Sequence, residues 1–154
     1  MDTGDFLGGE LLLGIAISLV NIAVHAMVMA LISRATHRTS LAVEAARAWL
    51  RLVLVMWSAV SILMLAHLVE VAIWAATYRM LSLTPRPFDS FYFPFVNYTT
   101  LGYGDILPAQ NWRLLGPITA MNGVLLFGWS AAVIYDILRT IAGIIAIQPQ
   151  SPPR

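Results

Sequence analysis

Three long apolar runs dominate the pattern of hydrophobic and polar positions along this chain. They cover about residues 11–33, 52–77 and 114–138, and each is more than twenty residues long. A helix rises about 1.5 Å per residue, so each run measures roughly 30 to 40 Å and can cross the ~30 Å hydrocarbon core of a bilayer. The pattern predicts an all-α membrane protein with three transmembrane helices and its two termini on opposite sides.

The segment between the second and third runs has a different pattern. Residues 84–87 read Thr-Pro-Arg-Pro and interrupt the chain, and an aromatic-rich stretch follows at about 88–99 that is too short to span a bilayer. Non-helical backbone at membrane depth is tolerated only where it is buried in protein or lines a cavity. We therefore predict a re-entrant helix at 88–99 and a functional loop after it.

Composition supports a membrane protein and removes several function classes. The chain is 59% hydrophobic and only 11% charged, with a mean hydropathy of +0.77, against roughly half and a quarter in a soluble domain. All nine basic residues are arginines scattered along the chain, so we expect no nucleic-acid partner. There is no cysteine, and the three histidines lie in different predicted elements without metal-ligand spacing. We expect a protein that is not an enzyme, with no cofactor and no small-molecule substrate.

The arginines also predict an orientation. Six of the nine lie in the segment 34–51 or after the third run, whereas the first ten residues carry acids and no basic residue. Because cytoplasmic loops are enriched in basic residues, the C-terminus is expected in the cytoplasm and the N-terminus outside. The acidic N-terminus is the reverse of a secretory signal, so the first apolar run is expected to be retained.

These features divide the chain into four parts. The prediction is an extracellular end and first transmembrane helix at 1–33, a cytoplasmic linker at 34–51 with a short interfacial helix at 41–49, a domain at 52–139 and a cytoplasmic tail at 140–154 with a disordered end. Within the domain at 52–139 we predict membrane-spanning helices at 52–77 and 113–139, with the re-entrant helix at 88–99 and a loop at 100–105 between them.

The loop after the re-entrant helix carries the strongest chemical signal. It reads Thr-Thr-Leu-Gly-Tyr-Gly-Asp from Thr99 to Asp105. An ion that leaves water needs replacement oxygens, which backbone carbonyls supply if successive C=O groups face one axis. This requires alternating left- and right-handed backbone, and glycine enters the left-handed region at little cost. An ordinary turn is the competing interpretation outside this context. The predicted ion-binding residues are Thr100, Leu101, Gly102, Tyr103 and Gly104, with Asp105 at the outer mouth.

With the helices on either side, this motif resembles the pore domain of the potassium-channel family, over about residues 52–139. The resemblance implies a pore domain with an outer helix at 52–77, a pore helix at 88–99, a filter at 100–105 and an inner helix at 113–139. The resemblance implies passive conduction of K⁺, which is the permeant ion rather than a cofactor, in a bacterial plasma membrane. One chain supplies one filter strand and a ring of carbonyls needs about four, so we expect a homotetramer surrounded by lipid. Two alternatives remain: a weakly selective cation channel, and a non-conducting assembly or regulatory subunit with a pore-like fold.

The resemblance also implies roles for residues of the third run. Gly123 resembles the family's inner-helix hinge, although close helix packing is the competing explanation. In that register, one helix face would line the cavity and the gate with Val124, Phe127, Ala131 and Tyr135.

Support for the filter is where this sequence departs from the family. Pro94 lies inside the predicted pore helix unless that helix starts late. Family members often carry an acid or an aromatic donor that holds the equivalent of Asp105, but here the matching positions are Phe93 and Val96, which have no donor.

Intramembrane ionisable groups are costly enough to suggest function, and the second run contains two of them. We therefore predict that Glu70, with His67, supports the filter from behind by bonding the pore helix or Arg113; an ordinary interhelical contact is the alternative for Glu70. Asn21 and His25 in the first run are expected to pair with a neighbouring helix.

Overall fold

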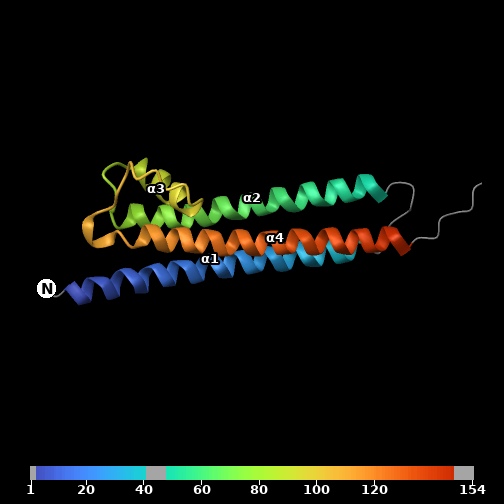
Figure 1. Ribbon diagram of the computed structural model, residues 1–154, viewed down its shortest axis with the longest axis horizontal. Helices are drawn as coiled ribbons and strands as arrows, with labels where there is room; N and C mark the ends of the chain where they lie inside the picture. Colours follow the sequence, from blue (N-terminus) through green and yellow to red (C-terminus); the bar gives the residue numbers. More distant parts are fainter. Residues whose placement is uncertain (1–2, 41–47, 148–154) are drawn as a thin grey trace, which may run out of the picture.

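The computed structural model describes residues 3–40 and 48–147. Its elements are α1 (Thr3–Ser40), α2 (Ala48–Met80), α3 (Asp89–Tyr98), η2 (Gln110–Trp112) and α4 (Leu115–Ile147). The three long helices form an elongated bundle, and the short α3 lies at one end against α2 and α4 (Figure 1). Three segments are long and apolar enough to cross a membrane: Gly8–Thr36, Leu52–Met80 and Gln110–Gly143. The predicted fold class is confirmed.

The three long helices are apolar on most of their surface, as expected where lipid is the solvent. Large hydrophobic side chains stand exposed on each of them, for example Leu12 on α1, Trp57 on α2 and Leu125 on α4. In water such a surface would drive association. In a bilayer it is the surface that the acyl chains cover.

The long helices extend beyond the bounds predicted from hydropathy. Helix α1 continues to Ser40 rather than 33, α2 runs from Ala48 to Met80 rather than over 52–77, and α4 begins at Leu115 rather than 113 and continues to Ile147 rather than 139. In α1 and α2, hydropathy marks the apolar core of the span, whereas backbone hydrogen bonds carry the helix on through polar residues at its ends. Residues 141–147 of α4 are themselves apolar and continue the third run beyond Arg139. The predicted tail at 140–154 therefore begins as helix.

The chain leaves α2 before it reaches Pro85 and Pro87. Ser82 has a left-handed backbone, with φ of +52°, and the N–H of Leu83 donates to the carbonyl of Tyr78 over 3.0 Å. A left-handed residue just after the last turn, with a hydrogen bond back into the helix, is a common C-terminal cap. The helix is thus closed before Pro85.

Two predictions fall largely outside the described residues. The interfacial helix at 41–49 overlaps the described chain only at its last two positions, and residues 148–154 of the predicted disordered tail lie outside it. Both stay predictions.

Helix α3 carries Pro94 in its interior, because the helix begins at Asp89. The alternative in which a late start puts this proline in the first turn is wrong. Proline has no N–H, so the carbonyl of Ser90, four residues earlier, loses its helical donor. The side-chain hydroxyl of the same residue, Ser90, lies 2.7 Å from the hydroxyl of Thr84 and connects the start of α3 to the loop before it.

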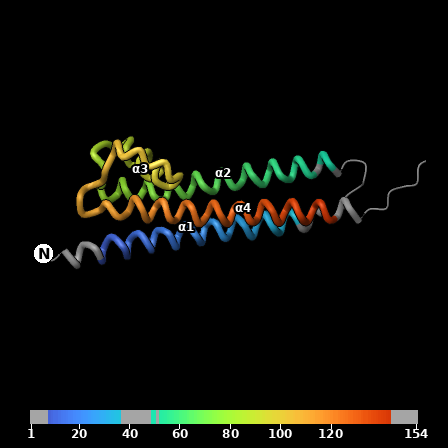
Figure 2. The backbone as a smooth tube through the Cα atoms, in the orientation of Figure 1, coloured from blue at the N-terminus to red at the C-terminus, as the bar shows by residue number. Residues whose placement is uncertain are grey.

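Two separate cores hold the bundle together. At the α3 end, a largely aromatic core forms around Trp74, Tyr78, Phe93, Tyr98 and Leu115. At the far end, an aliphatic core joins α1, α2 and α4 through Met29, Ile32, Ala59, Leu63, Ile137 and Ile141. The backbone trace in Figure 2 shows the chain turning from α3 through the loop into α4 beside the first of these cores.

Candidate functional site

The loop after α3 alternates in backbone handedness. Thr100, Gly102 and Gly104 have φ of +61°, +53° and +72°, while Leu101 and Tyr103 between them are not in the positive region. This is the alternation that successive carbonyls need in order to face one axis. The geometry agrees with the reason for expecting glycine at positions 102 and 104.

Thr100 is the residue whose conformation the sequence did not indicate. A β-branched residue with positive φ costs about 1 to 3 kcal/mol and persists only where its surroundings fix it. Here the N–H of Thr100 donates to the carbonyl of Asn97 at 2.8 Å, and the N–H of Leu101 donates to that of Val96 at 2.9 Å. The last turn of α3 therefore holds the first residue of the filter in place.

The filter is open on one side. Leu101 is 54% exposed and Tyr103 is 66% exposed. Both side chains therefore remain available for contacts outside the protomer.

Asp105 has a hydrogen-bond partner, but it is not at position 93 or 96, where the family resemblance placed it. The hydroxyl of Tyr92 donates to the Asp105 carboxylate, with 3.0 Å between Oη and Oδ2. This hydrogen bond is also the main reason that the pKa of Tyr92 is raised above its ordinary value. Phe93 and Val96 do lack a donor, but an aromatic donor was present one residue before Phe93. The inference that Asp105 is unsupported is corrected.

Behind the filter, a buried polar cluster surrounds Glu70 of α2. Its Oε1 lies 2.7 Å from Nδ1 of His25 on α1, and its Oε2 lies 3.0 Å from Nδ1 of His67 one turn earlier on α2. The hydroxyl of Tyr98, the last residue of α3, donates to the same Oε2. Glu70 and His25 are fully buried. The carboxylate thus joins two long helices to the end of the pore helix.

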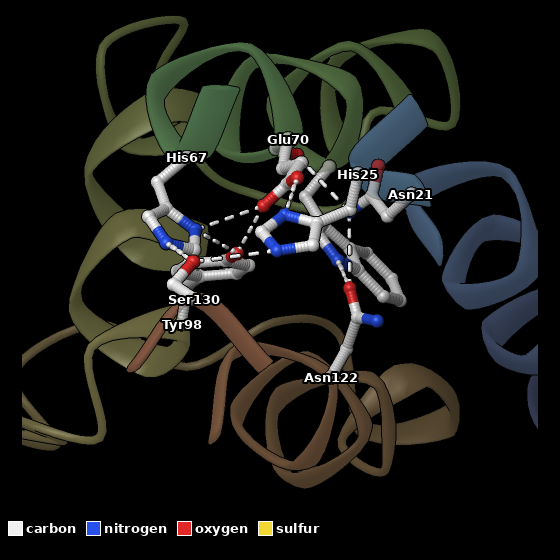
Figure 3. A network of polar contacts seen from close by, with 8 residues as sticks. Asn21, His25, His67, Glu70, Tyr98, Asn122 and Ser130 are labelled. Carbon is white, nitrogen blue, oxygen red and sulfur yellow. Dashed lines mark hydrogen bonds and ion pairs between the residues drawn. The ribbon is translucent and has the colours of Figure 1, made fainter. Parts of the chain in front are cut away.

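Ser130 of α4 completes this arrangement. Its Oγ lies 3.0 Å from Nε2 of His67 and 3.3 Å from Nε2 of His25. Oη of Tyr98 also lies 2.9 Å from Nδ1 of His67. Figure 3 shows the side chains closing on one another. We call the five side chains of Glu70, Tyr98, His67, Ser130 and His25 the Glu70 ring.

A second set of hydrogen bonds lies beside the Glu70 ring. Nδ2 of Asn21 on α1 donates to Oδ1 of Asn122 on α4 at 3.0 Å and to the backbone carbonyl of Glu70 at 3.3 Å. Nε1 of Trp74 donates to the same Asn122 oxygen at 3.1 Å. Helix α1 is therefore attached to the other two long helices by polar contacts, as expected for Asn21 and His25.

The structure brings together only part of the predicted support. Glu70 and His67 reach the pore helix through Tyr98. Arg113 does not contact either of them; it is exposed and lines a pocket of about 330 Å³ beside the filter loop, together with Asp105. The predicted bond between Glu70 and Arg113 is wrong because the two side chains lie in different places.

The histidines also correct the sequence interpretation. His25, His67 and Glu70 each offer one potential ligand atom, and these atoms lie within 4.8 Å of one another. Spacing along the chain concealed this group, because His25 precedes Glu70 by 45 positions and only the packing of α1 on α2 brings them together.

Gly123 lies where α4 meets the end of α3. A Cβ at this position would collide with the backbone carbonyl of Tyr98. Helix α4 is continuous through Gly123. The geometry therefore gives close packing as a reason for this glycine, and its role as a hinge stays a prediction.

The predicted cavity residues share an exposed stripe on α4. Val124 and Tyr135 are 54% and 66% exposed, and Ala131 is exposed as well. Phe127 lies at the edge of the stripe, since its ring centroid is 4.5 Å from that of His67. Their lining of a cavity stays a prediction.

Comparison with known proteins is consistent with a pore. Residues 66–140, just under half of the chain, match the family described as "Ion channel". This segment contains α3, the filter loop and the Gly123 contact, together with parts of α2 and α4. No curated protein and no solved structure matched the chain. The family match and the three membrane-length helices support an integral membrane protein that carries an ion-channel pore.

Proposed function

We propose that this chain is one subunit of a potassium-selective channel, in which four copies place their filter loops around a common axis and conduct K⁺ passively. The observation that carries the proposal is the alternating sign of φ from Thr100 to Gly104. Such backbone is rare, and here it lies in a loop between α3 and α4 with membrane-length helices on both sides. Carbonyls turned to one side can replace the hydration shell of a cation.

Exposure of the same residues supports the four-fold arrangement. The filter from Thr100 to Gly104 and the α4 stripe of Val124, Ala131 and Tyr135 are not covered by the rest of the protomer. A single chain would present an uncovered line of carbonyls to lipid, which is costly. Around an axis, the four loops would cover one another, and the four stripes would line a cavity below them.

The filter end of the bundle is proposed to face the outside. The N-terminus of α1 lies at the same end as α3 (Figure 1), opposite the end of α1 that carries Arg34 and Arg38 and the start of α2 that carries Arg51. The positive-inside tendency then places the C-terminus in the cytoplasm, and the family resemblance suggests a bacterial plasma membrane. Tyr92 would hold Asp105 at the outer mouth, and the Glu70 ring would hold the inner end of the filter.

A planar-bilayer experiment tests the proposal. With K⁺ on one side and Na⁺ on the other, purified protein should give currents that reverse near the potassium limit. Gly102→Ala and Gly104→Ala should abolish this selectivity, because both positions have positive φ and alanine is strained there. Gly8→Ala in α1 is the matched control, since a Cβ there meets nothing within 4 Å.

The other readings give different results. Reversal near zero would favour a weakly selective cation channel. Silence from assemblies that native mass spectrometry shows to be tetramers would contradict conduction and favour an assembly or regulatory subunit. A monomer or dimer in the same measurement would contradict the four-fold arrangement.

A further inference from the structure

The Glu70 ring is a closed circuit of hydrogen-bonding contacts. Glu70 Oε1 lies 2.7 Å from His25 Nδ1, and His25 Nε2 lies 3.3 Å from Ser130 Oγ. Ser130 Oγ lies 3.0 Å from His67 Nε2, and His67 Nδ1 lies 2.9 Å from Tyr98 Oη. The Tyr98 hydroxyl then returns to Glu70 Oε2. Five links close the circuit, and a sixth contact, 3.0 Å from His67 Nδ1 to Glu70 Oε2, crosses it. The five side chains come from all four α-helices of the described residues.

Counting protons around this circuit shows that one is missing when every group has its usual charge. Each link needs one proton between its two heavy atoms, so five links need five protons. Neutral His25, neutral His67, Ser130 and Tyr98 supply one each, and an ionised Glu70 supplies none. One link would then place two acceptors face to face in a buried site, at the cost of an unmade hydrogen bond.

The charge of the ring leads to the same conclusion. The titratable groups that contact Glu70 are His25 from α1, His67 from α2 and Tyr98 from α3; among the described residues α4 adds only the neutral Ser130 and a neutral amide. An ionised Glu70 with neutral partners therefore leaves a net charge of about −1 at membrane depth, which is costly. One additional proton cancels this charge and fills the fifth link. A second would make the ring positive and crowd one link with two protons.

We propose that the Glu70 ring is a proton-binding site that holds one exchangeable proton. The proton comes from water and forms an O–H bond on Glu70 or an N–H bond on one of the two histidines. It can pass around the ring, because each link that gains an N–H or O–H bond on one side loses one on the other, and the net charge stays at zero. Since Tyr98 directly precedes Thr99 and the filter, occupancy of the site is linked to the end of α3.

A metal ion is the competing occupant of these donors. His25, His67 and Glu70 offer ligand atoms within 4.8 Å of one another, and His₂Glu sets bind zinc in other proteins. The contacts of 2.7 Å and 3.0 Å from the Glu70 oxygens to the histidine nitrogens are hydrogen-bond lengths. A metal ion would displace the Nδ1 protons of the histidines. The expected count is therefore one additional proton per chain for a proton site and zero for a metal site.

The test counts protons directly in the full chain in lipid nanodiscs at neutral pH. A His37→Gln background removes the one histidine of the sequence that is not part of the Glu70 ring. Nitrogen-15 NMR of labelled histidine counts imidazolium groups, and infrared absorption counts protonated carboxyl groups that disappear on Glu70→Gln. The two numbers should add up to one per chain. A sum of zero or two would overturn the proposal.

Two variants sharpen the count. Glutamine at position 70 offers an NH₂ group on one side and a C=O on the other, and one of its two N–H bonds fills the fifth link. Glu70→Gln therefore closes all five links with neutral groups and should hold no imidazolium. Tyr98→Phe removes two links, but the direct 3.0 Å contact between His67 and Glu70 closes a smaller ring. That variant should keep one proton. An imidazolium that persists in Glu70→Gln, or a count of zero in Tyr98→Phe, would contradict the mechanism.

A zinc titration tests the competing metal site. Titration of the same background with zinc chloride should give no stoichiometric uptake at the ring. Uptake of one zinc per chain that is lost in His25→Gln, with a proton count of zero, would show a metal site instead. None of these measurements needs a conducting channel. A negative result at the Glu70 ring therefore does not contradict the proposed channel function, and an absence of current in the bilayer experiment does not contradict the proton site.

Discussion

At the α3 end of the bundle, Trp74, Tyr78 and Phe93 pack beside a buried network of hydrogen bonds, whereas at the far end Met29, Leu63 and Ile137 make only apolar contacts. Lipid tails are as apolar as leucine, so aliphatic contacts between helices specify their positions weakly in a bilayer. Hydrogen bonds are directional, and leaving one unmade is costly. We therefore expect the α3 end to be held in one geometry more firmly than the far end, and the far end is where a gate is predicted.

The largest expected effect comes from removing the carboxylate at the centre of the network. Glu70→Ala deprives His25, His67 and Tyr98 of a shared partner, and breaking such a buried ionic group costs about 3 to 5 kcal/mol. Unfolding in nanodiscs, followed by tryptophan fluorescence, measures this loss. Glu70→Gln is the matched control and should retain most of the stability, because an amide can close the same contacts. Equal losses of unfolding free energy in both variants would show that hydrogen bonds of residue 70 do not hold the α3 end in place.

Overpacking at Gly123 should have the next largest effect. Gly123→Ala drives a Cβ into the Tyr98 carbonyl, and overpacking of this kind costs about 1 to 3 kcal/mol. Because the collision moves the end of α3, we expect potassium selectivity to fall together with stability. Gly128→Ala, where a Cβ meets nothing within 4 Å, should leave the reversal potential unchanged. A Gly123→Ala protein with normal selectivity would mean that α3 tolerates displacement.

A smaller change at the far end tests the other half of the comparison. Ile137→Val removes one methylene from the aliphatic core, at a cost of about 1 kcal/mol. We expect single-channel recordings to show an altered open probability with an unchanged reversal potential. A shift in selectivity from this position would show that the two ends are not separate.

The smallest effect is expected at the outer mouth. Tyr92→Phe removes the hydrogen bond to Asp105 and should shorten the time for which currents are sustained. The bond raises the pKa of Tyr92, so the neutral hydroxyl is the form favoured in the folded protein. Its contribution is therefore present below the ordinary tyrosine value of about 10 and is lost as pH rises above it. Wild type and variant should differ at neutral pH and converge in alkali.

Local patterns were sufficient for the three spans and for the left-handed backbone at positions 102 and 104. Apolar runs located the three spans, because a bilayer demands continuous hydrophobicity. The glycines at 102 and 104 indicated left-handed backbone because few other residues adopt it. Thr100 could not be foreseen, since its conformation is imposed by hydrogen bonds to the last turn of α3.

The support of the filter depended on tertiary contacts that no local pattern contains. Glu70 and His67 were recognisable as neighbours three positions apart on one helix. His25 and Ser130 join them only because α1 and α4 pack on α2 at this level. Tyr92 is an aromatic donor one position before Phe93, but the family resemblance predicts the donor at positions 93 and 96.

Helix α1 lies outside the segment that matches the ion-channel family, yet it contributes His25 to the Glu70 ring, and the carboxylate of Glu10 lies 3.4 Å from the backbone nitrogen of Leu114. The pore of this protein is therefore not a portable module. A chimera that grafted residues 66–140 onto a foreign sensor would carry an incomplete buried network, and its designer would have to supply α1 as well.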